Sequence, residues 1–184
     1  MSVEIFGLIL TGGQSSRMGS DKAQITYGLR PQWQESGDLL RPFCREVYWS
    51  CTEEQKNRWQ LGALGLVDAI PGHGPASGLH AAFTLSNQVA WIVIGCDYPL
   101  LQPIDIQSLI DARALGVDAL VFFNERENEI EPMIALWEPQ AQRNFLEAFA
   151  KGNDSPRRIL RASKLKMIAP RSSEILTNQN TRRL

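Results

Sequence analysis

The sequence predicts an α/β fold in which helices cover both faces of a mostly parallel sheet. Three observations lead to this prediction. Short apolar runs alternate along the chain with stretches of helical length, the runs are apolar throughout, and two of the richest polar segments follow directly after such runs. Strands that are buried on both faces have this composition, and ligands of such sheets bind beyond the carboxyl ends of the strands.

The expected elements follow one another along a single domain, for which 184 residues are sufficient. Strands are predicted at residues 3–10, 46–50, 90–95 and 119–123, with a further candidate at 134–137. Helices are predicted at 78–85 and 104–115, with an amphipathic helix at 140–151 and a short basic one at 156–162. Four glutamates alternate with other residues between 125 and 131, which indicates a solvated loop or a hairpin edge.

The charge balance bears on the kind of partner. Nineteen lysines and arginines stand against twenty aspartates and glutamates, for a formal net charge of −1. A duplex-binding protein normally shows a basic excess or stripe, so we expect no nucleic-acid partner. A small anionic ligand needs only local positive charge, and the composition leaves that open.

The apolar pattern predicts neither a membrane segment nor a secretion signal. The longest apolar runs are too short to span a bilayer. Glu4 stands where a signal peptide carries positive charge, and a polar loop follows the first run at once. Cys44, Cys51 and Cys96 are odd in number and lack the spacing of a metal site, so we expect packed, reduced thiols. We therefore expect a cytoplasmic protein without membrane contacts.

The loop within LILTGGQSSRMGSDKA, residues 8–23, has the ingredients of a phosphate-binding loop. It has neither the Walker nor the dinucleotide glycine spacing. Gly12 and Gly13 allow backbone N–H groups to approach anionic oxygens closely. Arg17 offers a forked donor and Lys22 a compact charge. The alternative is a glycine turn that carries two solvated cations.

This loop resembles the signature L-x-G-G-x-S-x-R-M-G-x-D-K of the molybdenum cofactor guanylyltransferases (molybdopterin-guanine dinucleotide biosynthesis protein A family), within the nucleotidyltransferase superfamily. The matching residues are Leu10, Gly12, Gly13, Ser15, Arg17, Met18, Gly19, Asp21 and Lys22. Related cytidylyltransferases usually have Ala-Ala-Gly where this chain has Thr11-Gly12-Gly13. The resemblance implies a three-layer Rossmann-like nucleotidyltransferase fold with a mostly parallel, mixed central sheet. It also implies a nucleotide-binding part at about 1–100 and an acceptor-binding part at about 101–184.

A second segment, Gly74-Pro75-Ala76-Ser77-Gly78-Leu79, resembles the Gly-Pro-x-x-Gly segment with which the family helps to hold the nucleotide base. Its glycines permit close approach, and Pro75 stiffens the turn into a helix. Asp68 stands at about the position of the family's acidic base contact. His73 and His80 flank the segment, and we interpret both as loop or helix-surface residues rather than catalysts.

Two more segments match in the same order. Asp97 ends an apolar strand in a Cys-Asp-x-Pro motif, where a hard oxygen ligand suits Mg²⁺, although such an aspartate can also simply cap a turn. Asn178 and Asn180 match the family's Asn-x-Asn-Thr, which closes over the active site. Arg157 and Arg158 are candidates for contacts with the acceptor phosphate, or form a solvated helix face.

The resemblance implies an Mg²⁺-dependent enzyme that transfers GMP from GTP to molybdopterin carrying molybdenum, and releases pyrophosphate. The expected catalytic residues are Arg17, Lys22 and Asp97, and other molybdenum cofactor biosynthesis proteins are possible partners. The expected nucleotide-binding residues are Leu10, Thr11, Gly12, Gly13, Lys22, Asp68, Gly74, Pro75, Gly78 and Asp97.

Several departures from the family pattern keep alternatives open. Ser50 and Thr52 replace asparagines that are common after the second strand, and residues 28–31 are one residue longer than the usual Gly-Lys-Pro. The chain reads Arg182-Arg183-Leu184 where the family continues Asn-Thr-Pro with an acidic residue and a helix. A cytidylyl- or sugar-phosphate nucleotidyltransferase and a catalytically silent nucleotide-binding module remain alternatives.

Overall fold

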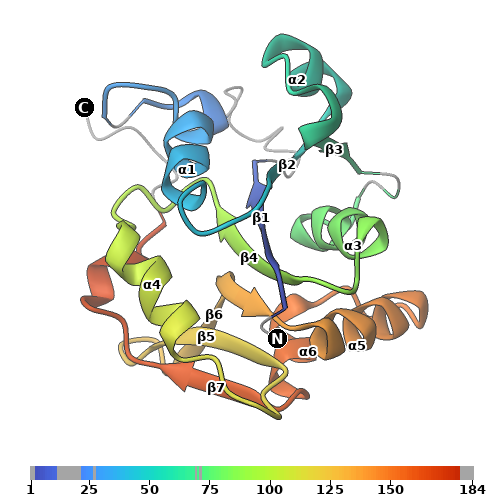
Figure 1. Ribbon diagram of the computed structural model, residues 1–184, viewed down its shortest axis with the longest axis vertical. Coiled ribbons are helices and arrows are strands. Elements are labelled where there is room, and N and C mark those ends of the chain that lie inside the picture. The colour runs from blue at the N-terminus through green and yellow to red at the C-terminus, as the bar shows by residue number, and fades with distance from the viewer. Residues whose placement is uncertain (1–2, 12–21, 27, 69, 71, 179–184) are drawn as a thin grey trace.

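A seven-stranded mixed sheet forms the centre of the protein (Figure 1). The computed structural model describes all residues except 1–2, 12–21, 27, 69, 71 and 179–184. The strand order is β3-β2-β1-β4-β6-β5-β7, and only β6 runs antiparallel to its neighbours among these strands. The strands are β1 (Ile5–Leu10), β2 (Val47–Cys51), β3 (Gly65–Val67), β4 (Ala90–Gly95), β5 (Ala119–Asn124), β6 (Glu129–Trp137) and β7 (Leu165–Ile168). The predicted mostly parallel, mixed sheet is confirmed.

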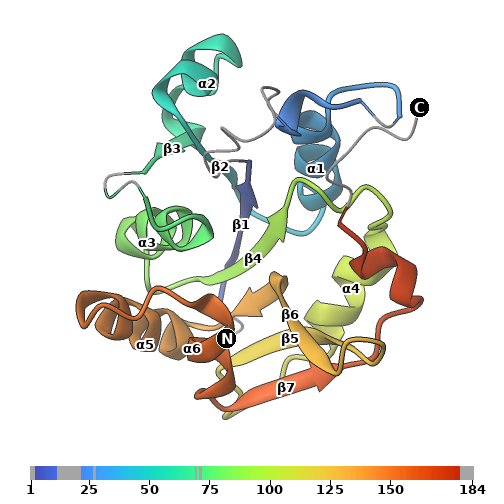
Figure 2. The ribbon, with the colours of Figure 1, turned by 180° about the vertical axis from the view of Figure 1, so that it is seen from behind.

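Helices cover the sheet on both faces, which completes the three layers (Figures 1 and 2). One face carries α1 (Gln32–Leu40) and α4 (Pro103–Asp111), and the other carries α3 (Pro75–Leu85), α5 (Pro139–Ala150) and α6 (Pro156–Arg161). A further helix, α2 (Glu53–Arg58), follows β2. The 3₁₀ turns are η1 (Lys22–Gln24), η2 (Gly62–Leu64) and η3 (Ser173–Leu176). No helix in the described part of the chain is long and apolar enough to cross a bilayer.

The two central strands explain why both faces carry a core. Successive side chains of a strand point to opposite faces. In β4, Ile92 and Ile94 pack with the α1 and α4 side, whereas Trp91 and Val93 pack with the α3 and α5 side. All four are fully or almost fully buried. A strand with two buried faces has to be apolar at every position, which is why the run at 90–95 predicted the strand correctly.

The structure differs from the sequence prediction at element ends and in four elements that were not predicted. The predicted helix at 104–115 ends at Asp111, because the chain turns over residues 114–117 with Gly116 at a φ of +78°. Both α1 and α2 are rich in polar residues, and β3 and β7 are short, so their patterns carried little signal. The alternating glutamates fall on the β5–β6 hairpin, as one of the two interpretations predicted.

An ion pair between the partly exposed Arg171 and the buried Asp105 holds the last described segment against α4. The guanidinium of Arg171 donates from Nε to Asp105 Oδ1 at 3.1 Å and from Nη2 to Oδ2 at 3.2 Å. Asp105 Oδ2 also accepts the backbone N–H of Gln102 at 2.9 Å, which caps the helix. Ile175 and Leu176 of η3 are buried in the same core as α4. Figure 2 shows η3 beside α4, so the fold brings residues 171–178 to the start of that helix.

We predict that Asp105→Ala lowers the free energy of unfolding by about 1–3 kcal/mol, because it removes a helix cap and leaves Arg171 without its acceptor. Urea denaturation would measure the change. Asp111→Ala, at the exposed end of the same helix, is the control and should change stability by less than about 0.5 kcal/mol. Equal effects of the two substitutions would contradict the assignment.

Candidate active site

The strand order predicts where a ligand binds. From β1 the chain proceeds outward to β2 and β3, and then crosses back to β4 on the other side of β1. In open α/β sheets, ligands bind at such a switch point, outside the carboxyl ends of the strands. The switch point here lies between β1 and β4, and the two motif-bearing segments after Leu10 and Gly95 both leave the sheet there.

Three hydrogen bonds join the strand ends at this switch point. Thr11 donates to the carbonyl of Ser50 from its backbone N–H at 3.2 Å and from its hydroxyl at 2.6 Å. The N–H of Cys96 donates to the carbonyl of Leu10 at 3.1 Å. Thr11 is buried, and its hydroxyl is used within the sheet. The structure therefore gives the side chain of Thr11 a structural role at the start of the loop.

The loop that follows Thr11 lies outside the described residues, and this includes Gly12, Gly13 and Arg17. At the end of the loop, the structure describes the backbone of Lys22, which is the first residue of η1. The predicted roles of these residues stay predictions. The described flanks place the two ends of the loop at the switch point and beside α1.

Asp68 lies at the end of β3 and is held by Ser50. The hydroxyl of Ser50 donates to Asp68 Oδ1 at 3.1 Å. Burial raises the pKa of Asp68, and the hydrogen bond from Ser50 partly lowers it again. Thr52, by contrast, caps α2: its hydroxyl accepts the N–H of Gln55, whose side chain accepts the N–H of Thr52 in return. The two residues that stand where amides were expected thus have different tasks.

The glycines of the Gly-Pro-x-x-Gly segment serve different purposes. Gly74 has a φ of +56° and precedes Pro75, the first residue of α3, so it provides a backbone conformation that other residues rarely adopt. Gly78 faces the sheet: a Cβ there would lie 2.3 Å from Ser50 Oγ and 2.8 Å from Leu10 Cδ2. The missing side chain of Gly78 lets α3 pack directly on the ends of β1 and β2.

Asp97 lies in the turn after β4, and its carboxylate is packed against the chain. A Cβ at Gly95 would lie 2.8 Å from Asp97 Oδ1 and 3.0 Å from the ring of Tyr98. Asp97 is half-buried, whereas Tyr98 is almost completely buried. The turn therefore holds a carboxylate at the switch point, where the sequence predicted it.

The described residues fit a metal that takes most of its ligands from a substrate. No three His, Cys, Asp or Glu side chains gather to hold an ion in the part of the chain that the structure describes. The carboxylate of Asp97 offers a single hard oxygen donor at the switch point. Mg²⁺ is typically bound through one or two carboxylates together with substrate phosphates and water, so this donor set suits it.

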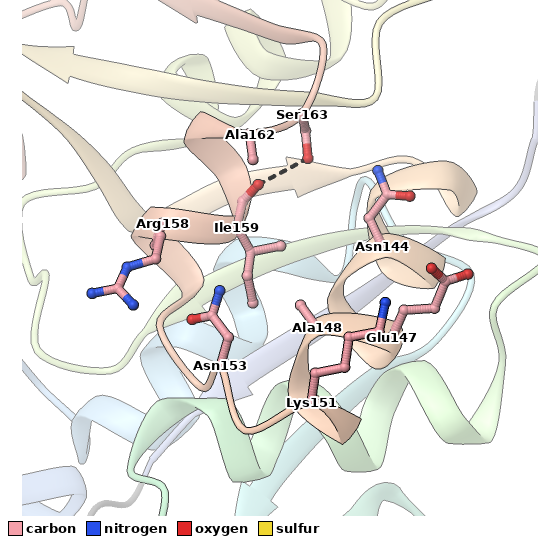
Figure 3. A pocket seen from close by; sticks show the side chains of 9 residues that line it. All are labelled: Asn144, Glu147, Ala148, Lys151, Asn153, Arg158, Ile159, Ala162 and Ser163. Carbon is pink, nitrogen blue, oxygen red and sulfur yellow. Dashed lines mark hydrogen bonds between the residues drawn. The ribbon is translucent and has the colours of Figure 1, made fainter.

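Two of the three arginines of α6, Arg157 and Arg158, point in different directions. The Nε of Arg157 lies 4.0 Å from Glu129 Oε1. Burial raises the pKa values of Tyr98 and Glu131, and the charge of Arg157 offsets a small part of this rise. Arg158 lines a pocket of about 530 Å³ between α5 and α6. Figure 3 shows Arg158 on one side of this pocket and the α5 side chains on the other. Arg157 thus faces the residues around the turn of Asp97, and Arg158 does not.

The remaining candidates lie outside this centre. Asn178 is exposed after η3, and Asn180 is outside the described residues. His73 is exposed and its Nδ1 lies 2.8 Å from Asp154 Oδ2, while the ring of His80 packs on Phe149. The prediction that both histidines are loop or helix-surface residues is confirmed.

Burial raises the pKa of the Cys44 thiol to about 12 and that of Cys51 to about 11, as expected for packed thiols.

Sequence reasoning missed three residues around the site. In the sequence, Ser50 stands out only as a departure from the family pattern, yet in the fold it contacts Asp68, Gly78 and Thr11. Tyr98 and Glu131 are hydrogen-bonded to each other, although they are far apart in sequence. The buried tyrosine beside Asp97 was the available signal for this pair.

Comparisons with known proteins agree with the fold and the family resemblance. Residues 7–167 match a family model described as MobA-like NTP transferase domain. The chain is 32% identical over 178 residues to the molybdenum cofactor biosynthesis bifunctional protein of Synechocystis, which covers 96% of this chain and 51% of that protein. It is 29% identical over 164 residues to the molybdenum cofactor guanylyltransferase of Shewanella putrefaciens, which covers 87% of this chain and 81% of that one.

A solved structure shares the fold. Molybdopterin-guanine dinucleotide biosynthesis protein A from Archaeoglobus fulgidus aligns with a TM-score of 0.71 at 20% identity, over 89% of this chain and 83% of that chain. At this identity the likeness concerns the fold alone. The chain spans about half the length of the Synechocystis protein.

We predict that Gly78→Ala destabilises the protein by about 1–3 kcal/mol, since the methyl group overlaps Ser50 and Leu10 and pushes α3 off the sheet. Helix propensity alone would favour alanine by about 1 kcal/mol. Thr84→Ala, at an exposed position of the same helix, is the control and should stay within about 0.5 kcal/mol. Thermal and urea unfolding would measure both, and a stabilised Gly78→Ala would contradict the packing role.

Proposed function

Because the chain belongs to the family of MobA-like NTP transferase domains, we propose that it transfers GMP from GTP to the terminal phosphate of molybdenum-bound molybdopterin, with release of pyrophosphate. One observation carries the proposal. The family's motifs are scattered along the sequence, and in the fold Leu10, Asp68 and Asp97 stand at the carboxyl ends of β1, β3 and β4, around one switch point. The names of the similar proteins from Synechocystis and Shewanella support the same cofactor pathway.

We assign the nucleotide to the part at about 1–100 and the acceptor to the part at about 101–184. The strands β1 to β4 come from the first of these parts, and β5, β6 and β7 come from the second. Gly12, Gly13 and Lys22 would surround the triphosphate, and Gly74, Pro75 and Gly78 would shape the base pocket. Leu10 and Thr11 would support the loop, as the hydrogen bonds of Thr11 suggest.

Asp68 is the proposed contact for guanine. A guanine base presents N–H donors, for which a carboxylate is a suitable acceptor. Ser50 already occupies one oxygen of Asp68 and thereby orients the carboxylate. A site that is built to hydrogen-bond one base rejects another strongly when the wrong base leaves its buried polar groups unpaired.

The proposed reaction needs alignment more than a strong base. An oxygen of the acceptor's terminal phosphate, whose second pKa is about 6, attacks the α-phosphorus of GTP. A new P–O bond forms, the bond from the α-phosphorus to the bridging oxygen of the β-phosphate breaks, and pyrophosphate leaves. Arg17 and Lys22 would neutralise the triphosphate and the leaving group, and Arg157 would approach the acceptor phosphate. Asn178 and Asn180 would close the site.

Asp97 is the proposed ligand of a divalent cation, Mg²⁺ in the first instance. When bound, the ion would neutralise charge on the phosphates and draw the α-phosphate and the acceptor together. Asp97 itself would hold the ion at the switch point, and the packing of its carboxylate on Gly95 supports a fixed position.

The direct test incubates the purified protein with Mg²⁺, molybdopterin and each of the four nucleoside triphosphates, and quantifies nucleotide–pterin product. We expect product with GTP, and a weaker preference over ATP and CTP than the family pattern implies, because Ser50 and Thr52 replace amides. Product with CTP alone would instead support a cytidylyltransferase. Nucleotide binding without product would support a silent binding module.

Asp97→Asn should lower Mg²⁺-dependent turnover by about a hundredfold or more, because the amide keeps the shape of the side chain but loses the charge. Binding of GTP without metal should remain measurable by calorimetry. Asp111→Asn, on the exposed end of α4, is the control for the loss of a negative charge. Undiminished turnover of Asp97→Asn would exclude Asp97 from the metal site.

A further inference from the structure

An irregularity in β6 directs a carboxylate toward the turn of Asp97. The register of the β5–β6 pair shifts between Val121, which pairs with Ala135, and Phe122, which pairs with Glu131. The residues between Glu131 and Ala135 thus form a bulge on the β5 side. Bulges often occur next to active sites, where they redirect a side chain.

The bulge fixes Glu131 through the backbone. Pro132 has no N–H to donate, and the N–H of Met133 donates to Glu131 Oε1 at 3.0 Å. The carboxylate of Glu131 is therefore held against the backbone of its own bulge. Ile134 pairs with Ile94, one residue before Gly95, so the bulge lies next to the end of β4.

The hydroxyl of Tyr98 donates to the carboxylate of Glu131 and so connects this bulge with the turn after β4. Tyr98 is only 5% exposed, and its ring packs on Gly95 at the same place as the carboxylate of Asp97. A shift of the ring would therefore move the surface against which Asp97 rests. The hydrogen bond to Glu131 ties this ring to the bulge in β6.

We propose that Glu131 and Tyr98 are positioning residues that hold Asp97 in its metal-binding geometry, an inference that rests on the proposed metal-binding role of Asp97. The path runs from the bulge in β6 through the hydroxyl of Tyr98 to the turn at Gly95 and Asp97. Neither residue needs to touch the substrate for this role.

The charges around Glu131 agree with a fixed, functional carboxylate. Burial raises its pKa, while the hydrogen bonds from Met133 and Tyr98 and the charge of Arg157 lower it. The negative charge of Asp97 also raises the pKa of Glu131. If only packing were required, a leucine or methionine would fill this position without the desolvation cost of a carboxylate.

Tyr98→Phe is the decisive variant, because it removes only the hydroxyl and keeps the ring that packs on Gly95. We expect the Kd for Mn²⁺, measured by electron paramagnetic resonance in the presence of GTP, to rise about tenfold. The value of kcat should fall by a similar factor while the KM for GTP changes less than about twofold. Glu131→Leu should reproduce these effects, and Glu131→Gln, which keeps both hydrogen-bond contacts, should restore the Mn²⁺ affinity to within about threefold.

Tyr48→Phe provides a matched control. The hydroxyl of Tyr48 donates to Glu46 Oε2 at 2.7 Å, so this variant removes a tyrosine–glutamate hydrogen bond near the amino end of β2. It should leave Mn²⁺ affinity, kcat and the melting temperature nearly unchanged. Equal Mn²⁺ affinity in wild type and Tyr98→Phe, or equal losses in Tyr98→Phe and Tyr48→Phe, would overturn the inference.

The two proposals fail in distinguishable ways. If no nucleotide–pterin product forms with the wild type, the proposed reaction fails, and the Mn²⁺ titrations of Tyr98→Phe and the Glu131 variants still decide the positioning role. If Asp97→Asn binds Mn²⁺ as tightly as the wild type, Asp97 is not the ligand and the inference falls with it.

Discussion

The parallel alignment of β1 between β2 and β4 is the constraint on which the site depends. The two carbonyls at the ends of these strands accept hydrogen bonds from Thr11 and Cys96, so the strands stop at the same level. The segments that follow Leu10, Ser50 and Gly95 therefore leave the sheet side by side. Asp68 and Asp97 come from strands on either side of β1, and neither would be near the switch point if the strand order were different.

Glycines allow close contacts at these aligned strand ends. Gly78 lets α3 touch Ser50, and Gly95 lets the carboxylate of Asp97 lie against its own strand end. Ser50 joins the two layers, because its carbonyl serves β1 and its hydroxyl serves Asp68. The site is therefore defined by backbone proximity as much as by charged side chains, and small changes of volume matter there as much as changes of charge.

The sequence predicted the elements whose own residues determine them. The strand at 90–95 is buried on both faces, and α3 has a proline at its start, so each carries a strong local signal. By contrast, α1 is stabilised by a contact that no local pattern reveals, since a Cβ at Gly37 would lie 2.5 Å from the ring of Trp49. The edge strand β7 depends on pairing with β5. Tyr98 and Glu131 meet only because β6 lies beside β4, which is a property of the topology.

The antiparallel strand β6 has a consequence for how the protein folds. Within the described sheet, β5 and β6 form a hairpin across the short turn at 125–128, and such units form in about 1–10 μs. The pairing of β1 with β4 joins Ile5 to Ala90, and its loop-closure entropy must be overcome before any contact compensates for it. We expect the hairpin to form early and the switch point to be assembled late. Substitutions at the switch point should then act mainly by accelerating unfolding, so that this region limits the lifetime of the native state more than the speed with which it is reached.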